Sequence, residues 1–180
     1  MTETKSSARP KIDRREFLKI AAAGSAFMIS GTALIKPSEA WAMDLKALKP
    51  ETMRTLIQLA RDIYPHDRLP DQLYAVAVKG HDDSAAADAA AKAMIEGGVA
   101  MLDDMAKAAH GVDYVSVGWE DQRVALLKQI EGGAFFKTVR SGLVVSLYNQ
   151  PEVWPYFGYE GESASKGGYI ERGFNDIAWL

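Results

Sequence analysis

The chain has 180 residues, of which 48% are hydrophobic and 25% charged, and its formal net charge is −3. This composition is that of a globular protein long enough to bury a core, and it provides no basic excess for a nucleic-acid surface. Cysteine is absent, which excludes disulfides, thiolate-held iron–sulfur clusters, cysteine-ligated zinc and the C-x-x-C-H attachment of haem.

The first 42 residues differ in charge from the rest of the chain. They carry seven basic and four acidic residues, whereas the remaining 138 carry fourteen basic and twenty acidic ones. The pair Arg14-Arg15 precedes a weakly apolar run of 16 residues, Ile20 to Ile35, which is shorter than the ~20 residues that a membrane span requires. A basic segment followed by an apolar run is typical of an export signal.

The details of this leader resemble a bacterial twin-arginine (Tat) signal. Asp13 stands where Ser or Thr usually precedes the arginines, and small residues follow the apolar run. We therefore predict a Tat signal peptide over residues 1–42, with an amphipathic helix or an uncleaved membrane anchor as alternatives. The residues that carry the signal are Arg14, Arg15, Phe17, Leu18 and Lys19, and those of the expected cleavage site are Ala40, Ala42 and Met43.

Two helices are expected after the leader. Apolar residues recur at helical spacing from Pro50 to Tyr64, with Pro50 suited to the first turn and Pro65 ending the helix. A second helix should begin at Pro70 and extend over residues 71–80, which places His81 just after a helix.

Three more helices are expected further along. The alanine-rich segment from Ala85 to Ala109 favours a helix, in which Gly97-Gly98 marks either a kink or a close approach of another helix. Residues 119–130 are amphipathic, and residues 134–148 form the most apolar segment, which we expect to be the central helix; its end, "LVVSLY", would also suit a strand. The sequence thus predicts a small all-α helical bundle over residues 43–148, followed by an irregular arm over residues 149–180.

The candidate catalytic groups are few. His66-Asp67, His81-Asp82-Asp83 and Asp103-Asp104 could serve in a metal or acid–base site, but no histidine has a partner at metal-binding spacing. A dinucleotide-binding glycine motif and a nucleophile elbow are also missing from the sequence. We therefore expect no catalytic, cofactor-binding or metal site in this chain, with a metal-assisted periplasmic enzyme as the alternative.

The arm is unusually aromatic. Eight of the seventeen aromatic residues lie in the last 33 residues, interspersed with glycine. So small a body would struggle to cover all of these rings, and exposed aromatic surface is typical of a binding site. We predict a partner interface here, while leaving open that some rings pack on the chain's own helices. The predicted interface residues are Tyr148, Asn149, Trp154, Tyr156, Gly158, Tyr159, Gly168, Tyr169, Phe174 and Trp179.

Two blocks of the sequence, "ARDIYPHDRLPDQLY" and the stretch from "YNQPEVWPYFGY" to the end, resemble the gluconate 2-dehydrogenase subunit 3 family. The second block is the more specific. Its resemblance lies in Tyr148-Asn149, Pro151, Trp154, Gly158-Tyr159, Gly161, Gly167-Gly168-Tyr169, Gly173-Phe174 and Trp179.

The resemblance implies a function. Members of this family are small subunits of FAD-dependent sugar and polyol dehydrogenase complexes. A larger catalytic subunit of the glucose–methanol–choline (GMC) oxidoreductase class holds the FAD, and a multihaem cytochrome c accepts the electrons. The small subunit supports folding of the catalytic one and supplies the Tat signal for both. The resemblance thus implies a non-catalytic, periplasmic subunit associated with the inner membrane through its complex, with a scaffold held by an uncleaved leader as a further alternative.

Overall fold

The structure, a computed structural model, describes residues 27–29, 33–35, 45–170 and 174. The chain divides into two compact units, residues 1–43 and 44–180. In the first unit, strands β1 (Phe27–Ile29) and β2 (Ala33–Ile35) pair antiparallel, with Met28 opposite Leu34. The residues of the predicted Tat signal and of the expected cleavage site lie outside the described residues. They are Arg14, Arg15, Phe17, Leu18 and Lys19 of the signal, and Ala40, Ala42 and Met43 of the cleavage site.

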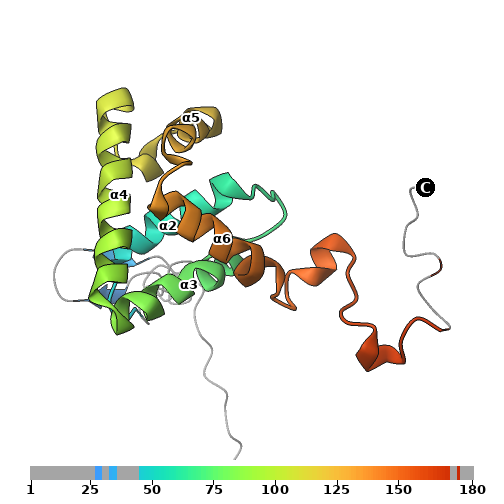
Figure 1. Ribbon diagram of the computed structural model, residues 1–180. Coiled ribbons are helices and arrows are strands. Elements are labelled where there is room, and N and C mark those ends of the chain that lie inside the picture. Colours follow the sequence, from blue (N-terminus) through green and yellow to red (C-terminus); the bar gives the residue numbers. More distant parts are fainter. Residues whose placement is uncertain (1–26, 30–32, 36–44, 171–173, 175–180) are drawn as a thin grey trace, which may run out of the picture. The chain divides into compact units, whose positions relative to one another are not determined.

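The second unit is a bundle of α-helices, as predicted (Figure 1). Among its described residues no strand occurs, and two short 3₁₀ helices follow the last α-helix. The α-helices are α2 (Pro50–Ile63), α3 (Asp71–Ala87), α4 (Ala89–His110), α5 (Glu120–Ile130) and α6 (Ala134–Tyr148).

The ends of these helices follow local sequence rules. Pro50 occupies the first turn of α2, and Pro65 follows its C-cap Tyr64. At the start of α4, the side chain of Asp88 accepts a hydrogen bond from the backbone N–H of Ala90 at 2.8 Å. Gly111 ends α4 with φ of 75°, a conformation that glycine adopts without strain.

The expected end of the second helix was wrong. α3 continues to Ala87, so His81 lies inside the helix and not after it. Gly80 does not stop the helix because it is exposed and the residues that follow favour helix, and the chain instead breaks at the Asp88 cap. The continuation of α3 places Asp82 on a buried face of the helix.

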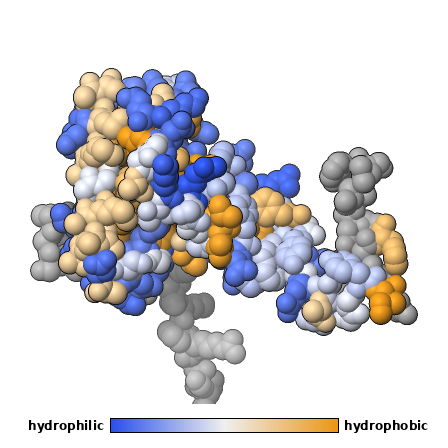
Figure 2. All heavy atoms as spheres, viewed as in Figure 1, coloured by the Kyte–Doolittle hydropathy of each residue, from blue (hydrophilic) through white to orange (hydrophobic). Residues whose placement is uncertain are grey.

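The expectation that residues 134–148 form the central helix was also wrong, because α2 is the central helix. α2 contacts every other α-helix of the bundle and buries residues around nearly its whole circumference. α6 is more apolar but buries a single stripe, leaving Val144 and Val145 52% and 65% exposed. Figure 2 shows the corresponding apolar surface over α6. A central helix is distinguished by burial on all sides, which mean hydropathy alone does not report.

The surroundings of Gly98 decide between a kink and a close approach of another helix at Gly97-Gly98. α4 runs without interruption through both glycines. A Cβ atom on Gly98 would lie 2.2 Å from the ring of Phe135 in α6, whereas one on Gly97 would meet nothing within 4 Å. The pair therefore marks a close approach of two helices, and only Gly98 is required for it.

Candidate partner-binding site at the root of the arm

The two blocks that carry the family resemblance meet in space. His66 lies in the loop between α2 and α3, and Tyr148 is the last residue of α6. The His66 Nε2 atom and the Tyr148 hydroxyl oxygen lie 2.7 Å apart, within hydrogen-bonding distance. This contact fixes the point at which the arm leaves the bundle.

Aromatic rings surround this contact. The Phe157 ring stands edge-on to His66 at a centroid distance of 5.0 Å and is tilted against Tyr148 at 5.8 Å. Tyr64 stands edge-on to Tyr148, with a centroid distance of 5.7 Å. We call these four residues, Tyr64, His66, Tyr148 and Phe157, the arm root. Aromatic pairs in this geometry contribute about 0.5–1.5 kcal/mol beyond the area that they bury.

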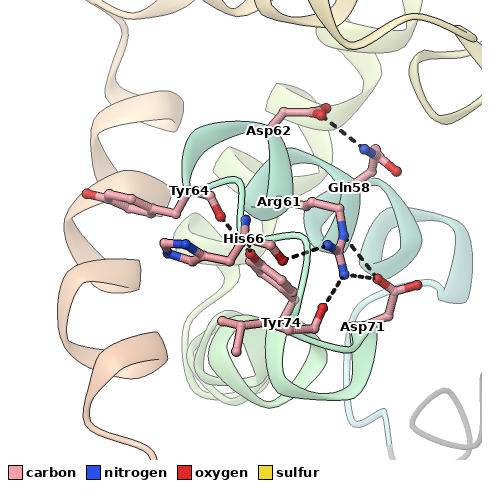
Figure 3. A network of polar contacts seen from close by, with 8 residues as sticks. Gln58, Arg61, Asp62, Tyr64, His66, Asp71 and Tyr74 are labelled. Carbon is pink, nitrogen blue, oxygen red and sulfur yellow. Dashed lines mark hydrogen bonds and ion pairs between the residues drawn. The ribbon is translucent and has the colours of Figure 1, made fainter. Parts of the chain in front are cut away.

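A polar network holds the loop that presents His66 (Figure 3). The Tyr74 hydroxyl donates to the Tyr64 carbonyl at 2.6 Å and accepts from the His66 N–H at 3.2 Å. The Arg61 guanidinium donates to the carbonyls of His66 and Leu69, and it lies 4.5 Å from the centre of the Tyr74 ring. Asp71 pairs with Arg61 and completes the network.

Both partners of the contact between His66 and Tyr148 are neutral near pH 7. Burial lowers the pKa of His66, and the nearby positive charge of Arg61 lowers it further. Burial raises the pKa of Tyr148, with a smaller contribution from Tyr64. The contact between them is therefore a hydrogen bond between uncharged groups, and not an ion pair.

The first residues of the arm pack on the bundle. Val153 is fully buried, and the Gln150 amide donates to the Leu73 carbonyl at 3.0 Å. The Trp154 indole N–H donates to the Tyr148 carbonyl at 2.9 Å, and its ring contacts Tyr159 edge-on. Tyr148 and Trp154 thus face the chain's own helices, which the sequence left open.

The other rings of the predicted interface are exposed. Tyr156, Phe157 and Tyr159 are between 43% and 51% exposed, and Tyr169 and Phe174 are 60% and 82% exposed. Asn149 and Gly158 are exposed as well, and Gly168 is partly covered. Gly158 and Gly168 have φ of 70° and 80°, so turns that strongly favour glycine set the course of the backbone. Trp179 lies outside the described residues.

A buried charged network that sequence reasoning missed surrounds the Asp62 carboxylate. Asp62 of α2 accepts hydrogen bonds from Arg123 at 2.8 and 3.0 Å and from Tyr114 at 2.6 Å. Burial and the carboxylate of Asp62 raise the pKa of Tyr114, so its hydroxyl remains a donor. This network ties α2 to α5 and to the 3₁₀ turn at Tyr114–Ser116. No sequence signal pointed to it, because Asp62 looks like a surface residue until its partners from distant segments are known.

Asp82 anchors the segment that precedes α2. Its fully buried carboxylate accepts three backbone N–H bonds, from Lys46, Ala47 and Leu48, at 2.8 to 3.0 Å, and it pairs with Lys79. Burial alone would raise the pKa of Asp82, but these donors hold it well below its ordinary value. We call this arrangement the Asp82 clamp.

The histidine–carboxylate candidates do not form a common site. Asp82 is occupied by the clamp, Asp83 pairs with Lys46, and the His81 ring lies against Gly142 of α6. Asp67, beside His66, is exposed. Asp103 accepts from the Tyr114 N–H at 3.0 Å, while Asp104 is exposed. Within the described residues, no group of three or more histidine, cysteine or acidic side chains could hold a metal ion.

No helix among the described residues is long and apolar enough to span a membrane. No protein-family model, curated protein or solved structure matches the chain.

Proposed function

We propose that this chain is a non-catalytic small subunit that binds an FAD-bearing catalytic subunit of the GMC oxidoreductase class and carries it through the Tat route. The complex would act as a sugar or polyol dehydrogenase at the periplasmic side of the inner membrane, with a multihaem cytochrome c as the electron acceptor. The FAD would belong to the partner, and this chain would hold no cofactor of its own.

The arm root is the observation that carries the proposal. The two sequence blocks that resemble the gluconate 2-dehydrogenase subunit 3 family lie far apart in the chain, yet His66 and Tyr148 join them. The exposed rings Tyr156, Phe157 and Tyr159 follow directly. Rings fixed at their base and exposed at their tips suit the anchors of a protein interface, because ordering them on binding then costs less conformational entropy.

The chemistry of the site supports binding more than catalysis. His66 and Tyr148 are bonded to each other, and the acidic neighbour Asp71 is paired with Arg61. A general base needs a lone pair directed at a substrate, and here Nε2 of His66 is directed at the Tyr148 hydroxyl. The exposed surface of the arm root and of the residues after it is aromatic, which suits association with another protein.

Export provides the test. The full chain is expressed in a host with a Tat system, together with the FAD-binding protein that co-purifies with it. Replacing Arg14-Arg15 by two lysines should leave both proteins in the cytoplasm. Flavin absorption and antibody detection in the periplasmic fraction measure the outcome. A flavoprotein that still reaches the periplasm with the two-lysine variant would contradict the proposal.

A matched control shows whether any arginine-to-lysine change in the leader affects export. Replacing Arg9 by lysine alters the same residue type in the same leader but leaves the twin arginines intact, and it should not change export. A wild-type chain that is exported and co-purifies with no flavoprotein at all would also reject the proposal.

A further inference from the structure

A groove separates α5 from α6, although a short turn joins the two helices. α5 packs on α2 and α4, and α6 packs on α2, α3 and α4, with little direct contact between α5 and α6. The resulting hollow has a volume of about 580 Å³. The residues that line it are Asp62, Ile63, Val124, Leu127, Lys128, Glu131, Gly132, Phe136 and Arg140.

The groove continues toward the arm root. A second hollow of about 330 Å³ shares Glu131, Phe136 and Arg140 with the first. It also reaches Tyr64, which contacts Tyr148 at the arm root. The two hollows, which we call the α5–α6 groove, therefore adjoin the surface proposed to bind the flavoprotein.

The groove is basic at its rim and apolar on its floor. Lys128, Lys137 and Arg140 are exposed, and none of their side chains forms a hydrogen bond or ion pair with another described residue. Figure 2 shows strongly hydrophilic side chains gathered between α5 and α6. The apolar floor includes Leu127 and Phe136.

The acidic groups of the groove do not cancel this positive charge. The Asp62 carboxylate already accepts four hydrogen bonds, two of them from the Arg123 guanidinium, so its charge is compensated within the bundle. Glu131 is the remaining carboxylate among the residues that line the two hollows. Three cations against one uncompensated anion favour an anionic ligand.

We infer that the α5–α6 groove binds a segment of the flavoprotein partner that carries carboxylates beside aliphatic side chains. The inference rests on the proposed function and adds a second contact to the arm. A basic rim over an apolar floor matches an acidic amphipathic segment, whose apolar side chains enter the groove while its carboxylates meet the rim. A protein segment fits better than a small molecule, because the rim is exposed along two adjoining hollows, whereas small-molecule sites enclose most of their ligand.

Charge reversal tests the rim. The probe is the co-purified flavoprotein, whose affinity for the full chain is measured by titration at low and at high salt. The double variant Lys128→Glu/Arg140→Glu should weaken binding by about tenfold or more at low salt and reduce its salt dependence. The matched control Lys92→Glu/Lys107→Glu changes charge equally at exposed residues of α4, outside both the groove and the arm root, and should stay within about twofold of wild type.

A steric block tests the floor without a change of charge. Gly132 lines the groove, and a Cβ atom placed on it meets nothing within 4 Å, so Gly132→Trp should fold and obstruct the groove. Gly118→Trp, also at a position with open space, is the control. Thermal unfolding of each variant verifies that the bundle is intact.

The outcomes separate the two proposals. Loss of affinity in the groove variants with retained affinity in both controls supports the groove. Groove variants that bind like their controls would overturn the inference while leaving the arm and the proposed function in place. A wild-type chain that binds no flavoprotein would reject the proposed function and this inference with it.

Discussion

His66 Nε2 and the Tyr148 hydroxyl lie 2.7 Å apart, although 82 positions separate the two residues in the sequence. The contact joins the loop between α2 and α3 to the last residue of α6, directly before the arm. Tyr148→Phe keeps the ring contacts and removes the hydroxyl, so the free energy of unfolding should fall by about 1 kcal/mol. Amide hydrogen exchange over residues 149–159 should accelerate, because the arm loses one of its fixed points.

The control for this prediction is Tyr156→Phe. Tyr156 is 43% exposed and has no side-chain hydrogen bond to the described residues, so stability should change by no more than about 0.5 kcal/mol. Equal effects of the two substitutions would show that the hydroxyl of Tyr148 does not hold the arm.

Acid should loosen the arm root. The pKa of His66 is lowered in the folded chain, chiefly by burial and further by Arg61. The unfolded chain therefore binds the proton more readily, and the stability that neutral His66 contributes is lost as pH falls below about 6.5 toward the lower folded pKa. The protection factors of residues 149–159, which are exchange rates corrected for the intrinsic effect of pH, should fall in that range.

The contribution of His81 to acid sensitivity must be distinguished from that of His66, because burial lowers the pKa of His81 too. His66→Asn should abolish the loss of protection that acid causes in the arm. His81→Asn should leave that loss in place and reduce only the pH dependence of global stability. An arm whose exchange responds to acid in the His66 variant as in wild type would refute the role of His66.

Alanine substitutions at the neighbouring residues Gly97 and Gly98 should change the free energy of unfolding in opposite directions. Gly98→Ala would place a methyl group 2.2 Å from the buried ring of Phe135, and the repacking should destabilise the bundle by about 1–3 kcal/mol. Gly97→Ala meets open space within the same helix and should stabilise it by about 0.5–1 kcal/mol. Chemical denaturation measures both, and equal signs would contradict the close approach of α4 and α6.

Breaking the Asp82 clamp should release the segment before α2. Asp82→Asn removes the negative charge that three backbone N–H groups and Lys79 surround, so residues 45–49 should become sensitive to limited proteolysis. The wild-type pKa of Asp82 is depressed, and its contribution to stability is present above about pH 4 and is lost as pH falls further.

The clamp variant should therefore be less stable at neutral pH and should lose less stability on acidification. Asp83→Asn is the control, because Asp83 forms only an exposed pair with Lys46. Identical acid unfolding curves for wild type and Asp82→Asn would rule out the clamp as a source of stability.

The helices could be predicted because their signals are local. Apolar spacing, Pro50 and Pro65 place α2, and the break at Gly132-Gly133 separates α5 from α6. Position within the bundle could not be predicted, since the burial of α2 on all sides depends on which helices surround it. Asp62 and Asp82 show the same limit. Each looks like a surface residue in the sequence, and only its partners from distant segments make its burial favourable.

For the candidate site, the sequence identified the aromatic arm but not its orientation. Trp154 and Tyr148 face the bundle because Trp154 bonds the carbonyl at the end of α6 and Tyr148 bonds His66. Tyr156 and Tyr159 are aromatic residues of the same glycine-containing segment, yet they are about half exposed. The difference arises from long-range contacts, which have no periodic signature in the chain.

One measurement tests the central claim most directly. The full chain and the variant Tyr156→Ser/Phe157→Ser/Tyr159→Ser are purified from the periplasm, and the flavin bound to each preparation is quantified together with any co-purifying flavoprotein. The wild-type chain should carry the FAD-bearing partner, whereas the variant, with the predicted Tat signal and the buried residues unchanged, should be exported without it. Equal amounts of flavoprotein with both chains would contradict the account.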